Sequence, residues 1–296
     1  MKKREHQVRG SIFIAISALF FSTYGIWSKL MTGVFGEFNQ AWIRALLLLA
    51  ALIPFGVKTK QFKRIKKQDY KWFLIISLSG GLNQAPYFFG FKHLPLGTAT
   101  LLFYLMLTIG AYLIGKLFFK EKITLLKYLS LGLAIIGLGV IYKFTLTSNQ
   151  ILPAIYTAIS GLLGASVVVF SKKISSNYSE TQILSSVFAA MFVCNVFLSL
   201  LFKEITPTFN LNTPWIAQIC YAVTMLIANS AVVVGFRHLE PSIGGIIGLL
   251  EVIFAAIFGV IFFDEQITFS LIIGGILIIG AIGLPNFIAL VKKNNK

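Results

Sequence analysis

Charged residues are scarce in this chain of 296 residues. They make up 12% of the sequence, whereas apolar residues make up 57%. Ordinary soluble domains contain about 25% charged and about 45–50% apolar residues. A soluble protein of this composition would lack the polar surface that keeps it in water. The composition therefore favours a protein whose solvent is the lipid bilayer.

Cysteines and catalytic motifs are equally sparse. The two cysteines, Cys194 and Cys220, lie inside apolar runs without metal-ligand spacing, which favours packing roles over a disulfide or a metal site. The sequence has no HExxH, P-loop, GxGxxG or nucleophile-elbow pattern. We therefore expect no cofactor, no metal and no enzyme activity, and transport driven directly by ATP would need another chain.

The chain does contain many long apolar runs. Ten of them are long enough to cross about 30 Å of hydrocarbon as helices. A transmembrane barrel would instead show alternating strands of about ten residues. The first run follows Met-Lys-Lys-Arg, but it is too long for the core of a signal peptide, so we interpret it as a retained span. The predicted fold is an all-α membrane protein with ten transmembrane helices, over 11–31, 40–57, 71–91, 96–118, 124–142, 151–171, 181–202, 214–236, 241–263 and 268–291.

Basic residues are distributed unevenly between the connections. If the N-terminus lies in the cytoplasm, 21 Lys and Arg residues fall on the cytoplasmic side, seven of them in 58–71, and only Lys92, Lys143 and Lys203 fall on the other side. The positive-inside rule then predicts a multi-pass protein of the plasma (inner) membrane with both termini cytoplasmic. The same distribution explains the net charge of +16 without a nucleic-acid partner.

The two halves of the chain resemble each other. Residues 15–29, AISALFFSTYGIWSK, align without gaps on 158–172, AISGLLGASVVVFSK, and FFKEKIT at 118–124 matches FFDEQIT at 262–268. Each half, 1–146 and 147–296, contains five runs, so the second half should enter the membrane from the opposite side. Inverted repeats of this kind are typical of alternating-access transporters. Glycines in the last run of each half predict close approach of neighbouring helices: Gly132, Gly137, Gly274, Gly275, Gly280 and Gly283.

These motifs make the chain resemble the drug/metabolite transporter superfamily, in its EamA-like branch of ten helices. The pattern is FFKEKIT…GLAIIG in the first half and LLEVIFAAIFGVIFFDEQIT…GGILIIG in the second. The resemblance covers the whole chain and implies two homologous five-helix halves and a transport function. It also implies a proline after positions 107 and 251, where this chain has Thr108 and Val252, so bending of these two spans should differ from the family.

Glu251 is the most informative polar residue, because it lies near the middle of the ninth run. A carboxylate at that depth costs roughly 2.5–3.5 kcal/mol on insertion scales, so it should face the bundle interior or a wet cavity. Its counterpart in the first half is Leu107. We interpret Glu251 as a proton-coupling group or as the counter-ion of a cationic substrate group, and a packing role is the alternative.

Amide side chains occupy equivalent positions in the third and eighth runs. Gln84, with Asn83 beside it, corresponds to Asn229. Amides in hydrocarbon need partners, so these should face inward and meet near the central axis. Substrate contact and hydrogen bonding between helices explain them equally well.

Aromatic residues and one arginine complete the set of candidate substrate-binding or coupling residues. Tyr104 lies at a depth close to that of Glu251, whereas Trp27 also fits an interfacial belt. Arg44 lies one turn into the second run, where it could bind a substrate carboxylate or extend to the outer interface, and the latter is favoured. The full set is Glu251, Gln84, Asn83, Asn229, Tyr104, Thr108, Tyr24, Trp27, Tyr87 and Arg44.

The leading hypothesis is a secondary transporter or facilitator of a small polar metabolite, an amino acid or a related compound, with alternating access. Its partners would be that small molecule and membrane lipids, with proton coupling through Glu251 as one mechanism. The substrate cavity should lie between the halves, near the bilayer midplane. An exporter of drugs or lipid precursors is the alternative within this class, and a channel or a membrane scaffold is the alternative from another class.

Overall fold

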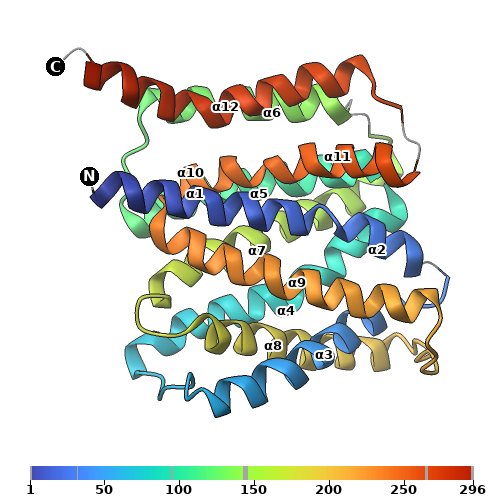
Figure 1. Cartoon of the computed structure of the whole chain (residues 1–296). Coiled ribbons are helices and arrows are strands. Elements are labelled where there is room, and N and C mark those ends of the chain that lie inside the picture. Colours follow the sequence, from blue (N-terminus) through green and yellow to red (C-terminus); the bar gives the residue numbers. More distant parts are fainter. Residues whose placement is uncertain (1, 32, 95, 143–145, 264–265, 295–296) are drawn as a thin grey trace.

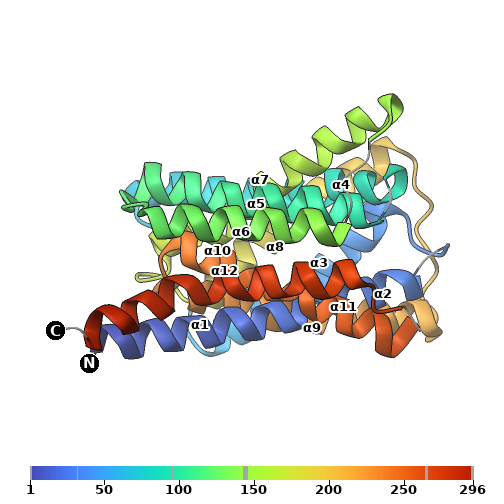
Figure 2. The same ribbon diagram turned by 90° about the horizontal axis from the view of Figure 1, so that it is seen from above.

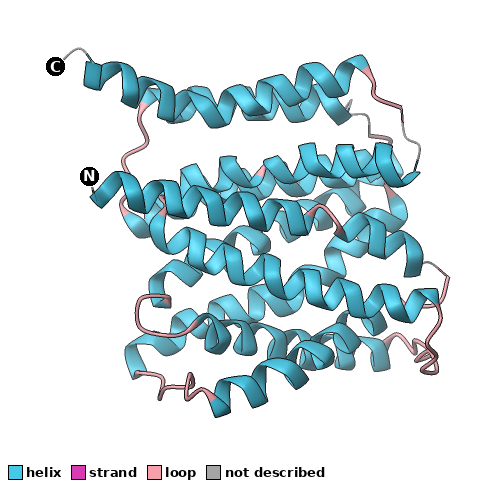
Figure 3. Ribbon diagram, viewed as in Figure 1, coloured by secondary structure: helices cyan, strands magenta, loops and turns pink. Residues whose placement is uncertain are grey.

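The computed structural model describes residues 2–31, 33–94, 96–142, 146–263 and 266–294. Within these ranges the regular structure is helical, as Figure 3 shows. The helices are α1 (Lys2–Phe21), α2 (Tyr24–Met31), α3 (Glu37–Lys58), η1 (Lys67–Asp69), α4 (Tyr70–His93), α5 (Leu96–Phe119), α6 (Leu125–Tyr142), η2 (Ser148–Gln150), α7 (Ile151–Ile174), α8 (Glu180–Leu201), α9 (Thr213–His238), α10 (Pro241–Gly248), α11 (Leu250–Phe263) and α12 (Phe269–Asn294).

Every predicted run coincides with one helix or with two consecutive helices. Seven of the helical stretches among the described residues are long and apolar enough to cross a membrane, and two apolar stretches, Leu125–Ile141 and Phe269–Leu284, are shorter. The predicted third span is α4, a helix of 24 residues whose amides, Asn83 and Gln84, make it less apolar. The all-α architecture predicted from the sequence is therefore confirmed.

The helices run lengthwise beside one another, with both termini at the same end of the bundle (Figure 1). The first repeat packs against the second through equivalent pairs. α4, the third span, lies along α7, the sixth span. α1, the first span, lies along α9, the eighth span, which is the equivalent pair with the two halves exchanged. α3 lies along α8, which joins the second and seventh spans, while α6 and α12, the last span of each half, form a pair at one edge (Figures 1 and 2). This pairing of equivalent elements fits the predicted inverted repeat.

Two spans that the sequence predicts as continuous are broken. The first span is interrupted at Ser22 and Thr23, between α1 and α2, where the two hydroxyls donate to the carbonyls of Leu19 (2.6 Å) and Phe20 (2.7 Å). Such side-chain bonds to the backbone bend helices. The ninth span is interrupted at Leu249, between α10 and α11. The family proline is missing from both spans. α5 is continuous through Thr108, whereas the ninth span is interrupted even without a proline.

The two repeats differ in how tightly equivalent helices approach. α5 packs along α7 more extensively than α10 and α11 together pack along α1. The cause lies in the aligned sequences: a Cβ added to Gly161 of α7 would lie 2.4 Å from the carbonyl oxygen of Phe103 on α5. In α1 the corresponding positions to Gly161 and Gly164 carry Ala18 and Phe21, which hold the neighbouring helix further away.

Of the six glycines predicted to allow close approach, two do so. Gly137 on α6 and Gly274 on α12 face each other, because a Cβ on Gly137 would lie 2.9 Å from the Gly274 carbonyl oxygen. The prediction is wrong for the other four, whose added Cβ atoms would meet no atom of the described residues within 4 Å: Gly132, Gly275, Gly280 and Gly283.

Candidate functional site

Polar side chains from five helices gather where the two broken spans meet the rest of the bundle. We refer to six of them as the polar cluster. Tyr24 begins α2 directly after the first break, and Glu251 is the second residue of α11, directly after the other. α1 packs against both α10 and α11, and α2 packs against α9 and α11, so the two breaks belong to one region. The polar cluster consists of Tyr24, Arg44, Tyr104, Tyr221, Asn229 and Glu251.

Arg44 is completely buried, at 0% exposure, in the interior of the protein. Its Nη2 atom donates to Oε1 of Gln40 at 3.2 Å, and its guanidinium carbon lies 3.5 Å from the ring centroid of Tyr221. Its Nε and Nη1 atoms have no hydrogen-bond partner among the described residues. The favoured prediction, that Arg44 extends to the outer interface, is therefore wrong. The side chain turns toward α9 because Tyr221 offers it a ring face and Gln40, one turn earlier, offers it an oxygen.

Two tyrosines lie close to both Arg44 and Glu251. The rings of Tyr24 and Tyr221 lie 4.4 Å apart between centroids, at 51° to each other. Both phenols are within electrostatic range of Arg44 and of Glu251. The Tyr24 hydroxyl lies close to the Asn229 side chain, although it lacks a hydrogen bond of good geometry. The arrangement brings two groups of opposite charge close to one aromatic pair.

Glu251, in the second repeat, has a hydrogen-bond partner in the first repeat. The hydroxyl of Tyr104 on α5 donates a hydrogen bond to its carboxylate, and Tyr104 is itself 7% exposed. Behind Tyr104 follow Phe103, at 5.2 Å between ring centroids, and Tyr87 of α4, which lies 4.2 Å from Phe103. The sequence predicts that Tyr104 and Glu251 lie at similar depth, and in the structure the two side chains are in direct contact. Tyr87 does not belong to the polar cluster but is connected to Tyr104 through the ring of Phe103.

The amides of the third and eighth spans are not brought together. Asn83 donates to the Ser160 carbonyl at 2.7 Å, and the Ser160 hydroxyl donates back to the Asn83 carbonyl at 2.8 Å. Gln84 donates to Asn83 (3.4 Å), while Asn229 donates to the Met225 carbonyl one turn earlier on α9 (2.9 Å).

This arrangement corrects the prediction that these amides meet. α4 packs mainly against α7 and α8, whereas α9 packs mainly against α1, so the two sets of amides lie in different helix pairs. Asn83 joins α4 to α7 through its hydrogen bonds with Ser160. Of these three amide residues, Asn229 is the one that belongs to the polar cluster.

The remaining predicted residues occupy supporting positions. Trp27 donates from Nε1 to the Thr23 hydroxyl at 3.1 Å and packs against the largest apolar core, which argues against the interfacial belt. Thr108 is 1% exposed, and its hydroxyl has no hydrogen-bond partner among the described residues. Three further residues were not anticipated from sequence: Tyr221, Gln40 and Gln218, of which Gln218 donates to the Gln40 carbonyl at 2.6 Å. The spacing of Gln40 and Arg44, one helical turn, is the sequence signal that could have indicated the first of these contacts.

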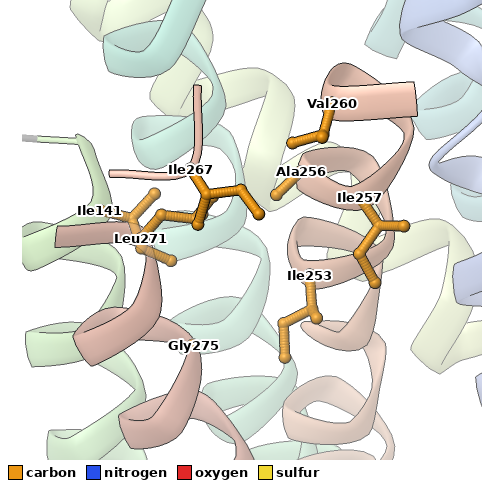
Figure 4. Close-up of a pocket in the computed structure, with 8 residues that line it drawn as sticks. All are labelled: Ile141, Ile253, Ala256, Ile257, Val260, Ile267, Leu271 and Gly275. Carbon is orange, nitrogen blue, oxygen red and sulfur yellow. The ribbon is translucent and has the colours of Figure 1, made fainter. Parts of the chain in front are cut away.

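A separate cavity of about 140 Å³ lies beside α11, along the stretch from Ile253 to Val260. Figure 4 shows it between α11 on one side and Ile141, Leu271 and Gly275 on the other. Its lining is apolar throughout, and it contains no member of the polar cluster. A polar solute would find no hydrogen-bond partner there, so the polar cluster is the stronger candidate for a polar ligand.

Ion pairs join the two repeats at the end of the bundle that carries the termini. Lys127 of the first repeat lies 2.5 Å from Glu121 and 2.6 Å from Glu240 of the second repeat. Glu121 also accepts hydrogen bonds from the backbone and hydroxyl of Ser242 at the start of α10. We refer to Glu121, Lys127, Glu240 and Ser242 as the terminal-end network. It links the two halves at this end of the bundle.

Comparison with known proteins agrees with this architecture. The model of the EamA-like transporter family matches residues 8–143 and again residues 151–287. The chain belongs to the EamA-like transporter family. It is therefore a multi-pass membrane protein of a transporter family, which points away from enzyme activity.

Relatives of this EamA-like transporter include the pseudopaline exporter CntI of Pseudomonas aeruginosa, matched in two strains. Each is 23% identical over 244 residues, which cover 82% of either chain. A solved crystal structure aligns with a TM-score of 0.81 at 15% sequence identity, and the alignment covers 96% of this chain and 98% of that one. The last likeness shows the fold alone.

Proposed function

We propose that this EamA-like transporter moves a small polar metabolite, an amino acid or a related compound, across the plasma membrane by alternating access. The observation that carries the proposal is the polar cluster, in which the buried cation of Arg44 and the carboxylate of Glu251 both lie near Tyr24 and Tyr221 without forming an ion pair. The region lies at the breaks of two spans, and discontinuous helices near the midplane form the binding sites of many transporters.

The energetics favour a site over a structural role. A charged side chain inside the membrane costs several kcal/mol, and an arrangement selected for stability alone would offset that by pairing the charges directly. Arg44 makes no ion pair with a described residue. Two opposite charges kept apart are suited to a ligand that carries both signs.

Alternating access is supported by the difference between the repeats. The contact of α5 with α7 is tight, its counterpart between α1 and α10–α11 is looser, and the terminal-end network joins the halves at one end. One repeat unit thus adopts two packings in the same structure, which is what exchange between inward-open and outward-open states requires. With both termini in the cytoplasm, as the basic residues predict, the terminal-end network would be the cytoplasmic closure.

Export is the direction that the curated relative favours, because the matched protein of Pseudomonas aeruginosa is named as a pseudopaline exporter. Glu251 is consistent with two mechanisms of coupling. It could bind a proton that is exchanged for substrate, or it could bind a substrate ammonium group.

One observation favours a second candidate, export of a drug or lipid precursor. The apolar cavity beside Ile253 and Leu271 would accept a hydrocarbon chain but no polar head group (Figure 4). A channel or a scaffold has less support, since the polar cluster does not form a ring of equivalent charges.

Counterflow in proteoliposomes tests the proposal. Vesicles loaded with one unlabelled metabolite at high concentration should transiently accumulate the labelled metabolite from outside, and the rate should saturate. The experiment screens the common amino acids and related polar metabolites. A channel would give flux without counterflow, a scaffold would give no flux, and either result would reject the proposed function.

A further inference from the structure

Arg44 is a buried cation whose hydrogen-bonding capacity is mostly unused. Nη2 donates to the Gln40 side chain, and the Nε and Nη1 atoms have no hydrogen-bond partner of good geometry among the described residues. A guanidinium carries five N–H donors in a rigid plane. Buried donors of this kind are nearly always satisfied in native proteins, so an unsatisfied set in the interior points to a ligand that is bound during function.

The neighbours of Arg44 do not neutralise it. Tyr221 and Tyr24 influence it electrostatically, the Tyr221 hydroxyl lies within hydrogen-bonding reach of the guanidinium, and no described carboxylate forms an ion pair with it. Stacking on Tyr221 at 3.5 Å is favourable but replaces only a part of the lost hydration. A monovalent anion would supply the missing charge and accept the free N–H groups.

The surroundings select among anions. Glu251 lies near the same two tyrosines, and a phosphate, with its larger negative charge, would be repelled by that carboxylate. A carboxylate whose molecule also carries an ammonium group would match both ends, with the carboxylate on Arg44 and the ammonium near Glu251. Gln218, which donates to the Gln40 carbonyl, also has a buried oxygen without a partner among the described residues.

We propose that Arg44 is the carboxylate subsite of the transporter and restricts its substrates to molecules that carry a free carboxylate beside an ammonium group. This inference rests on the proposed function, because it assigns a specificity to the same site. It makes Tyr221 a positioning residue, since its ring holds the guanidinium plane while the α3 residue Gln40 holds one nitrogen.

The test measures selectivity for the carboxylate within one protein preparation. The probes are a mixture of the common L-amino acids other than aspartate and glutamate and the matched mixture of their α-carboxamides, which keep the side chain and ammonium group but lack the α-carboxylate. At about pH 6.5 the amino groups of both mixtures are protonated. Exchange through proteoliposomes is quantified by mass spectrometry, and the ratio of acid to amide is taken for each pair. The ratio does not depend on the fraction of protein that is active, so it remains valid for a variant that folds poorly.

Wild-type protein should prefer the acids by at least about tenfold, which is the discrimination expected of one buried charge-assisted contact. Arg44→Gln should reduce the ratio to about one. Arg44→Lys should give an intermediate ratio, because lysine keeps the charge but not the planar donors. Arg9→Gln, which changes an exposed arginine of α1, should keep the wild-type ratio.

Three results would overturn the inference, and they separate it from the proposed function. Equal exchange of acids and amides by wild type, or a wild-type ratio in Arg44→Gln, would leave a transporter in which Arg44 only joins α3 to α9. Failure of wild type to exchange any acid or amide would reject the proposed amino-acid transport and the subsite with it.

Discussion

Glu251→Gln is the substitution that separates the two coupling mechanisms. It keeps the size of the side chain and an oxygen that can accept the Tyr104 hydroxyl, but it removes the ability to ionise. The altered hydrogen bond changes stability by about 1 kcal/mol, and the amide removes a charge whose insertion costs roughly 2.5–3.5 kcal/mol. We therefore expect the variant to insert and fold, with a melting temperature close to that of wild type.

The effect on transport depends on the mechanism. If one proton is exchanged for each substrate molecule, a gradient of one pH unit is worth about 1.4 kcal/mol and accumulates substrate up to about tenfold. Glu251→Gln should reduce that accumulation to none while exchange without a gradient continues. If the carboxylate binds a substrate ammonium instead, the variant should weaken binding at every pH, by about tenfold or more.

The assay is uptake into proteoliposomes with and without an imposed pH gradient, with initial rates at several external pH values. Glu37→Gln, at the first residue of α3, serves as the matched control and should behave as wild type. Wild-type rates together with wild-type pH dependence in Glu251→Gln would refute both mechanisms and leave a packing role for Glu251.

Three other predictions concern topology, the terminal-end network and the loops. In a cysteine-free background, a cysteine at Lys66 should resist impermeant thiol reagents in intact cells, and rapid labelling would reverse the predicted orientation. Lys127→Met leaves Glu121 buried without its cation, so we expect about 3–5 kcal/mol of destabilisation and a lower melting temperature, whereas Lys127→Arg should lose much less. Burial raises the pKa of the Tyr178 hydroxyl, which donates to Asp69 at 2.7 Å. Stability from a raised pKa is present below the unfolded value, about 10, and is lost as the pH rises through the folded value, so wild type should lose more stability than Tyr178→Phe in melts at alkaline pH. Equal alkaline losses in the two proteins would contradict this assignment.

The sequence predicts the helices well because apolar runs of about twenty residues have few alternatives in a bilayer. It does not predict the breaks. Ser22 and Thr23 look like ordinary polar residues of a span, and only the structure shows that their hydroxyls turn to the carbonyls of the preceding turn. The interruption at Leu249 has no proline to indicate it.

The sequence predicts only part of the candidate site, because the direction of a side chain depends on neighbours that are distant in the sequence. Glu251 stands out in the sequence, because a carboxylate in an apolar run is costly wherever it points. Arg44 does not, because a long basic side chain near the end of a span usually reaches the interface, and its inward direction depends on Tyr221, which is distant in the sequence. Equivalence by repeat suggested that Gln84 and Asn229 would meet, but helix packing rather than sequence position decides which amides are neighbours.

The central claim is that the polar cluster binds the substrate, and a structure with bound ligand tests it most directly. The ligand should be the amino acid that exchanges fastest in the counterflow screen, added in excess to the protein in lipid nanodiscs. We predict density for its carboxylate against the Nε or Nη1 atoms of Arg44 and for its ammonium group near Glu251, with Tyr24 and Tyr221 beside it. Density for the ligand in the apolar cavity beside Ile253 and Leu271, with the polar cluster unchanged, would contradict the account.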